Sequence, residues 1–189
     1  MPTNHVQLKD AHPDLYLAQR LAFEPCGFNT TNIMEERESS DYGALDFSLN
    51  GQRCKFRVGK ITQKKIGFFL TIWKRMRDGP ILPYDLADPV DLYIFSARSG
   101  EHFGLFVFPK SILAEKGVLS KEGKGGKRAI RVYPPWVVTD SKQAKNTQVW
   151  QEIYFLKISE DKPINSSRVH RLIEGLNKAQ KTLKMNVRN

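Results

Sequence analysis

Cysteine is scarce in this chain, and long apolar runs are missing. The 189 residues include two cysteines, Cys26 and Cys54, too few for a disulfide scaffold, so we expect free thiols in a cytoplasmic protein. No apolar stretch reaches the ~18 residues that a membrane-spanning helix needs, and the first residues lack the apolar stretch of a secretory signal. The composition therefore argues against a disulfide-rich secreted protein and against a membrane partner.

Metal, nucleotide and catalytic motifs are missing as well. The four histidines show no metal-ligand spacing, and the two cysteines form no C-x-x-C pair. The glycine-rich run 121–128 lacks the end of a phosphate-binding loop, because Lys127 is followed by Arg128 instead of Ser or Thr. His102 beside Glu101 could serve as a general base, but a histidine at a hairpin turn is more often an ordinary surface residue. We therefore expect no cofactor, no metal and no catalytic residue.

The clearest pattern that is present is a β-hairpin. Asn50-Gly51 separates two alternating runs, and this dipeptide favours a two-residue turn because both residues tolerate positive φ. In the resulting register Leu45 opposes Phe56 on an apolar face. The other face carries three opposed pairs: Ala44 with Arg57, Asp46 with Lys55, and Ser48 with Arg53.

Positive charge is concentrated in this part of the chain. The formal net charge is +10, and residues 53–77 contain nine lysines and arginines without a single acid. One carboxylate, Asp46, offsets the cation row of the hairpin, and we expect it to pair across the hairpin with Lys55. Three cations in one row repel one another, which is unfavourable on a face that contacts only solvent. The sequence therefore predicts a surface that binds a polyanion.

The remaining elements follow from hydrophobic periodicity. The patterns predict helices at 13–24, 111–117 and 141–151, strands at 67–75, 90–97, 103–108, 129–136 and 153–158, and a basic amphipathic helix over 166–189. Asp140 is the expected N-cap of the third helix, and strand 67–75, apolar on both faces, is expected to be central. The order predicts a single α+β domain over residues 1–189, with a central, mostly antiparallel mixed sheet flanked by helices.

Several long runs also follow one another in a specific order. They are FRVGKITQKKIGFFLTIWKR, GPILPYD, FGLFVFPKSIL, KGVLS, GKRAIRVYPPW and a helix that contains Lys142-Gln143-Ala144. Together they resemble the MepB-like family over residues 42–158. The resemblance implies a restriction-endonuclease-like fold, similar to the PD-(D/E)xK nuclease core without its catalytic set, and action through contact with nucleic acid. It implies nothing for residues 166–189.

A nuclease of that class needs an Asp on one strand and an acidic-x-Lys on the next, because two carboxylates must hold Mg²⁺. Asp46 and Lys60 occupy suitable places, but Val58 stands where the second carboxylate is required. Glu35 or Glu36 could supply a further ligand from the preceding segment, which keeps a residual Mg-dependent nuclease open as an alternative. We expect no cleavage.

The interpretation that the sequence favours is a non-catalytic protein that binds RNA or single-stranded DNA with little base specificity. No helix-turn-helix, zinc-finger or RNP sequence is present, whereas cations repeatedly neighbour aromatics that can stack unpaired bases. The basic run 121–128 is expected to be a mobile cationic clamp. The expected phosphate-binding residues are Arg53, Lys55, Arg57, Lys60, Lys64, Lys65, Arg75, Lys127, Arg128 and Arg131, and the expected stacking residues are Tyr133 and Trp136. A second alternative is an adaptor whose basic helix 166–189 docks an acidic protein.

Overall fold

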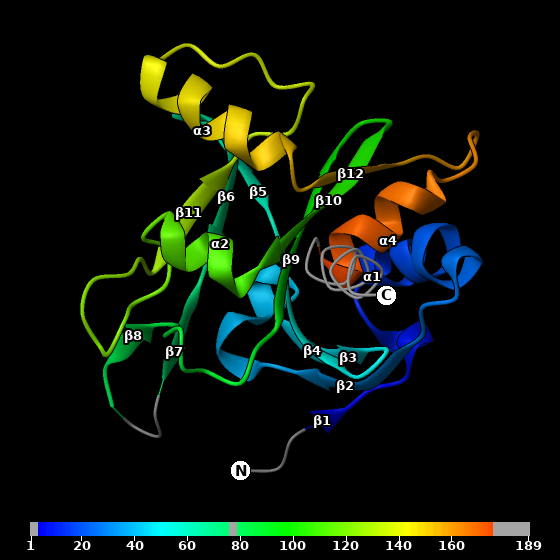
Figure 1. The fold of residues 1–189 in the computed structure, drawn as a ribbon, viewed down its shortest axis with the longest axis horizontal. Coiled ribbons are helices and arrows are strands. Elements are labelled where there is room, and N and C mark those ends of the chain that lie inside the picture. The colour runs from blue at the N-terminus through cyan, green and yellow to red at the C-terminus, as the bar shows by residue number, and fades with distance from the viewer. Residues whose placement is uncertain (1–3, 76–78, 176–189) are drawn as a thin grey trace, which may run out of the picture.

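A seven-stranded sheet and a three-stranded sheet form the body of the protein (Figure 1). The computed structural model describes residues 4–75 and 79–175, without the side chains of residues 37–39. The helices are α1 (Pro13–Ala18), α2 (Lys110–Glu115), α3 (Lys142–Glu152) and α4 (Ser166–Glu174), and a π-helical turn (Gln19–Phe23) continues α1. The strands are β1 (Asn4–His5), β2 (Thr30–Glu35), β3 (Leu45–Leu49), β4 (Gln52–Val58), β5 (Lys60–Thr62), β6 (Lys65–Thr71), β7 (Trp73–Arg75), β8 (Ile81–Pro83), β9 (Leu92–Ser99), β10 (His102–Pro109), β11 (Ala129–Val132) and β12 (Phe155–Ile158).

The large sheet has the order β1-β2-β3-β4-β9-β10-β12. Its β4–β9 ladder is parallel, whereas β3–β4 and β9–β10 are antiparallel, so the expected mixed, mostly antiparallel sheet is confirmed. The hairpin register is also confirmed, with Leu45 opposite Phe56 and Asp46 opposite Lys55. Asn50 adopts φ 46° and Gly51 φ 85°, as the predicted turn requires.

The small sheet has the order β11-β6-β5, and a separate pair joins β7 to β8. The predicted strand 67–75 is interrupted at Ile72, and its first part, β6, is the middle strand of the small sheet. The predicted strand is therefore central, but in the small sheet and not in the large one. Phe68 and Leu70 point into the core, while Phe69 is half-buried on the opposite face of the strand. Apolar residues on both faces of a strand therefore do not require that both faces are fully buried.

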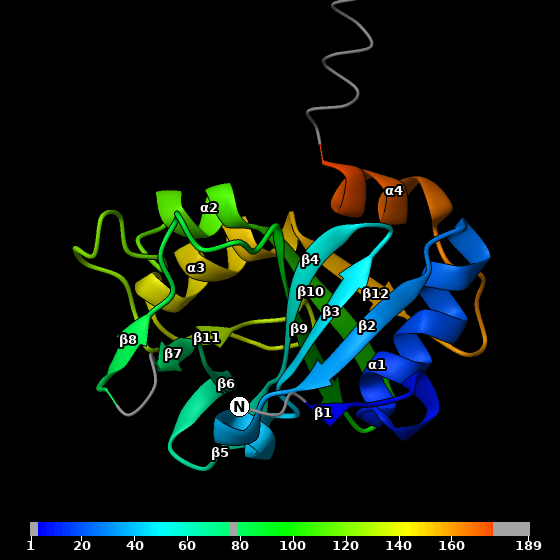
Figure 2. The same ribbon diagram turned by 90° about the horizontal axis from the view of Figure 1, so that it is seen from below.

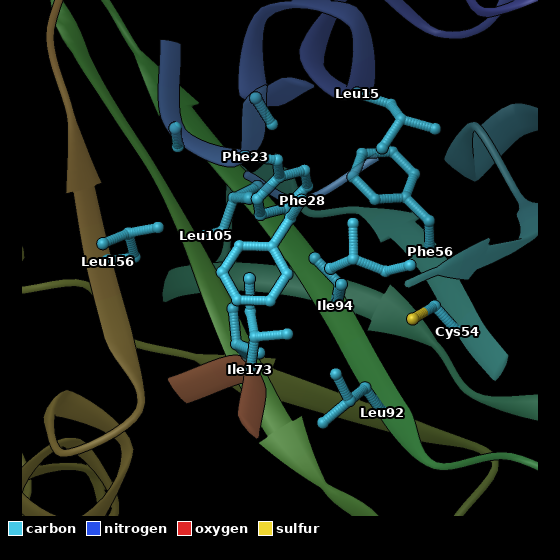
Figure 3. Packing of buried hydrophobic residues seen from close by; sticks show 14 of the residues in the cluster. Leu15, Phe23, Phe28, Cys54, Phe56, Leu92, Ile94, Leu105, Leu156 and Ile173 are labelled. Atoms are coloured by element: carbon cyan, nitrogen blue, oxygen red, sulfur yellow. The ribbon is translucent and has the colours of Figure 1, made fainter. Parts of the chain in front are cut away.

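Two apolar cores lie on opposite faces of the large sheet, because side chains alternate along its strands. Leu92 and Ile94 of β9 enter the first core, which α1 and α4 cover, and Figure 3 shows its packing. Tyr93 and Phe95 enter the second core, which the small sheet and α2 cover. Figure 2 shows the two sets of covering elements on either side of the sheet.

The C-terminal helix is described as α4, Ser166–Glu174. Its Val169, Leu172 and Ile173 are buried in the first core, and the rest of the predicted helix 166–189 lies outside the described residues. None of the helices within 4–75 and 79–175 is long and apolar enough to cross a membrane.

Candidate functional site

Two of the three cations of the hairpin row, Lys55 and Arg57, belong to a network of ion pairs, in which Arg57 is buried and Lys55 is half-buried. Lys55 Nζ lies 2.7 Å from Glu36 Oε1 and 2.6 Å from Asp46 Oδ1. Arg57 is 1% exposed, lies 2.6 Å from Glu36 Oε2 and donates a hydrogen bond of 3.2 Å to the Tyr84 hydroxyl. The predicted pairing of Asp46 with Lys55 is confirmed. The prediction that Lys55 and Arg57 face a polyanion was wrong, because carboxylates of the chain itself already neutralise them.

The two carboxylates of this network have opposite pKa shifts. Burial opposes ionisation of Glu36, but Arg57 and Lys55 outweigh it and lower the pKa of Glu36 to about 2. Burial and the neighbouring Glu36 carboxylate raise the pKa of Asp46 to about 6. Glu36 is therefore the anion that holds the network together, and Asp46 carries its charge at a cost to the folded state.

This difference predicts a pH dependence of stability. The folded protein holds the proton of Asp46 more tightly than the unfolded chain does, so ionisation of Asp46 costs stability as pH rises from about 4 through 6. Between pH 4 and pH 7 the unfolding free energy of the wild type should fall by on the order of 1–2 kcal/mol relative to that of an Asp46→Asn variant, which has no proton to lose at this position. Urea denaturation of both proteins across this range measures the difference, and parallel stability curves would contradict it.

A cleft of about 690 Å³ is lined by residues of the small sheet and α3 and by Lys116 just after α2. Figure 1 shows where these elements lie. Five predicted site residues meet there: Lys64, Lys65, Lys127, Arg131 and Tyr133. The sequence analysis did not identify four of the other lining residues as part of a site: Phe69, Lys116, Thr147 and Trp150. Asp140 is the one carboxylate among the lining residues, against five basic side chains, so the cleft carries a net positive charge.

Three of the cleft lysines are available to a ligand. Lys64, Lys65 and Lys127 are exposed, and no carboxylate of the described residues lies within ion-pair distance of them. Lys116 is different, because its Nζ lies 2.9 Å from Glu115 Oε1. The available charge therefore lies on the sheet side of the cleft.

Arg131 fixes the position of the lysine-bearing turn between β5 and β6. Its Nη1 donates hydrogen bonds of 3.2 Å to the carbonyls of Lys65 and Gly67, and its Nη2 donates one of 2.8 Å to Thr62 Oγ1. With these donors used, Arg131 acts mainly by holding Lys64 and Lys65 at the edge of the cleft.

Two glutamines attach α3 to β11 and to the segment that follows it. The Gln151 side chain donates to the Arg131 carbonyl and accepts from the Tyr133 backbone N–H, both at 2.9 Å. Gln148 Nε2 donates to the Val137 carbonyl at 2.8 Å. Sequence reasoning missed both residues, because a polar helix gives no apolar stripe to show which face is docked.

We expect Gln151→Ala to lower the free energy of unfolding by about 1–3 kcal/mol, since a buried backbone donor and acceptor lose their partner. Asn146→Ala, at an exposed position on the same helix, is the matched control and should change stability by less than about 0.5 kcal/mol. Equal urea midpoints for the two variants would contradict the role given to Gln151.

Tyr133 lines the cleft and lies against Gly67. A Cβ at Gly67 would come within 2.6 Å of two Tyr133 ring carbons, and φ of +87° also favours glycine there. The other two aromatic side chains of the cleft have cations near their rings, Lys116 Nζ at 5.9 Å from Trp150 and Arg131 Cζ at 5.5 Å from Phe69. Within the described residues, Tyr133 has neither a ring partner nor a cation partner, so it is the best placed to stack on a ligand.

Trp136 does not line this cleft. It stacks on His102 with ring centroids 5.1 Å apart, and it makes edge contacts with Phe68 and Phe155. The stacking role of Trp136 therefore stays a prediction, for a half-buried ring that lies outside the cleft and already stacks on His102.

Four more predicted site residues lie outside the cleft lining: Arg53, Lys60, Arg75 and Arg128. Arg53 pairs with Asp91 at 3.6 Å, Lys60 Nζ lies 4.6 Å from the centroid of the Tyr42 ring, and Arg75 donates to the Gly79 carbonyl. The structure therefore does not unite the predicted set on one sheet face.

The basic loop 121–128 is held to the body of the protein by hydrogen bonds. Asp85 Oδ2 accepts from Ser120 Oγ at 2.6 Å and from the Gly123 backbone N–H at 3.0 Å. The Lys127 backbone N–H donates to the Val118 carbonyl at 2.9 Å. These bonds attach the loop near both of its ends and place Lys127 in the lining of the cleft, while the mobility of the loop stays a prediction.

Both cysteines are free thiols, as the sequence predicts, and both are buried. Burial raises the pKa of the Cys54 thiol to about 12, so this group stays protonated near neutral pH and is a poor nucleophile. Residues 4–75 and 79–175 contain no group of three or more His, Cys, Asp or Glu side chains that could hold a metal ion.

Comparison with known proteins adds a family. The MepB-like family model matches residues 36–157, a range that includes every lining residue of the cleft. A solved structure described as "Crystal Structure of MepB" is 33% identical to the chain, with a TM-score of 0.67, and the match covers 77% of this chain and 97% of that one. No curated protein matches the chain.

Proposed function

The chain belongs to the MepB-like family, and we propose that it is a non-catalytic protein that binds RNA or single-stranded DNA in the cleft between the small sheet and α3. The observation that carries the proposal is that three exposed lysines without carboxylate partners, Lys64, Lys65 and Lys127, line a cleft with five basic residues and one acid. Such lysines suit phosphate groups, because each contact releases counterions from the nucleic acid.

The size and the aromatic lining of the cleft favour a single strand over a duplex. A volume of about 690 Å³ suits a small ligand and so accommodates a nucleotide or two, but not a double helix. Tyr133 in its lining offers a ring to an unpaired base, and such stacking contributes about 1–3 kcal/mol per base without regard to sequence. Low base specificity follows, since phosphates and ring faces are common to all sequences.

The absence of catalysis is part of the proposal. The residual nuclease would depend on Asp46, with Glu36 as a further ligand, and both carboxylates contact Lys55 within the network. Val58 still stands where the second acid of the motif is needed. The nuclease-like core that the family resemblance implies then concerns the fold and not the reaction.

The adaptor alternative has less support in the described part of α4. Arg168 donates to the carbonyls of Glu152 and Phe155, and the apolar face of the helix is buried. These contacts attach α4 to its own protein and reduce the basic surface that it could offer to an acidic partner.

Fluorescence anisotropy with labelled RNA, single-stranded DNA and duplex DNA tests the proposal. The single strands should bind more tightly than the duplex, and the logarithm of the binding constant should fall steeply with the logarithm of the salt concentration. No binding at about 50 mM salt, or affinity independent of salt, would refute the proposal. Cleavage of a labelled strand with added Mg²⁺ would instead support the nuclease alternative.

A further inference from the structure

The two walls of the cleft differ in charge. The sheet wall carries Lys64, Lys65 and Arg131, and Lys127 lies beside it. The wall formed by α3 and the residues just before it carries one carboxylate and neutral polar side chains: Asp140, Ser141, Gln143 and Thr147. A nucleotide bound in this cleft therefore meets cations on one side and hydrogen-bond acceptors on the other.

Asp140 is not used by the protein itself. The sequence predicts it as the N-cap of α3, but the N-cap is Ser141, whose Oγ accepts from the Ala144 backbone N–H at 3.1 Å. Asp140 is exposed, lines the cleft and has no hydrogen bond or ion pair with any of the described residues. The prediction of an Asp140 cap was thus wrong, and its carboxylate is available to a ligand.

The chemistry of a carboxylate restricts what it can recognise. It repels phosphate and only accepts hydrogen bonds, so a ligand group that it binds must be a donor, either a base N–H, which differs between sequences, or a hydroxyl of the sugar. With the phosphates on the lysine wall, the donor that every ribonucleotide carries and every deoxyribonucleotide lacks is the 2′-hydroxyl. Gln143 lies on the same wall, and its side-chain amide has no hydrogen-bond partner in the described residues, so it can add a second contact.

We propose that Asp140 accepts a hydrogen bond from a ribose 2′-hydroxyl, so that the cleft selects RNA over single-stranded DNA. The inference rests on the proposed function, because it assigns the sugar of the nucleic acid that the cleft binds. On the same wall, Thr147 Oγ1 donates to the Gln143 backbone carbonyl at 2.9 Å, and this bond fixes the orientation of the Thr147 hydroxyl.

The test compares an oligouridylate with an oligodeoxyuridylate of the same length, about eight nucleotides, because the two differ only in the 2′-hydroxyl. The wild type should bind the RNA about tenfold or more tightly than the DNA, the difference expected for a hydrogen bond to a charged acceptor. Asp140→Ala should lose most of this preference by weakening RNA binding, while DNA binding stays equal or improves because a negative charge is removed.

Asp161→Ala is the matched control, since it removes an exposed acid outside the cleft and should keep the preference. Equal binding of the two strands by the wild type, or a preference unchanged in Asp140→Ala, would overturn the inference and leave the proposed function standing. Binding of neither strand would overturn both. Circular dichroism of each variant confirms that the exposed substitutions leave the fold intact.

Discussion

Replacing Glu36 with Gln should lower the free energy of unfolding by about 3 kcal/mol, because it leaves the buried Arg57 without its anion. Arg57 is 1% exposed, and Glu36 is the one carboxylate that contacts it in the described residues. A guanidinium cannot lose its proton to escape the cost of burial, so the penalty remains as an unpaired buried charge. Urea denaturation at pH 7 measures the loss.

Asp46→Asn is the matched control in the same network. Burial already disfavours the charge on Asp46, and Lys55 keeps Glu36 as a partner when Asp46 is neutralised. We expect this variant to match the wild type at pH 7 or to exceed its unfolding free energy by about 1–2 kcal/mol, because the wild type carries a disfavoured charge at that pH. Equal losses for the two variants would mean that Glu36 does not hold the network together.

Replacing Lys64, Lys65 and Lys127 together with Ala should weaken the binding of a short single strand about 100-fold at about 0.1 M salt. Counterion release gives about 0.7 logarithmic units per phosphate contact on single strands at this salt concentration, and the variant removes three contacts. The slope of the logarithm of the binding constant against that of salt should become shallower by about 2. Anisotropy titrations at several salt concentrations measure both quantities.

The control for this variant carries the same change in net charge elsewhere on the surface. Lys9, Lys157 and Lys162 are exposed, lie outside the cleft lining and make no ion pair in the described residues. Their joint replacement with Ala should change affinity only slightly. A comparable loss in both triple variants would show that binding depends on overall charge and not on the cleft.

The hairpin could be predicted to the residue, but the environment of its cation row could not. Asn50-Gly51 and strict alternation fix the pairing of β3 with β4 from local sequence alone. The burial of Lys55 and Arg57 depends on Glu36, which follows β2 and reaches them only because β2 pairs with β3. Such a contact between distant segments leaves no periodic pattern in the sequence. The three cations on one strand therefore predicted an exposed polyanion-binding surface.

The cleft could be predicted only in part. The charge pattern identified Lys64, Lys65 and Lys127 individually, because basic residues cluster around them in the sequence. What joins them is the pairing of β6 with β11 and the attachment of α3 through Gln151, and neither follows from local pattern. Asp140 was identified as a helix cap, but the neighbouring Ser141 caps α3 instead.

Photo-crosslinking tests most directly whether nucleic acid binds in the cleft. A short RNA containing 4-thiouridine, crosslinked to the whole chain and mapped by mass spectrometry, reports which aromatic side chains lie against its bases. We expect the adducts on peptides that contain the cleft aromatics Phe69, Tyr133 and Trp150. Adducts confined to Trp73, Trp136 or the β3–β4 hairpin would contradict the account, because these lie outside the cleft.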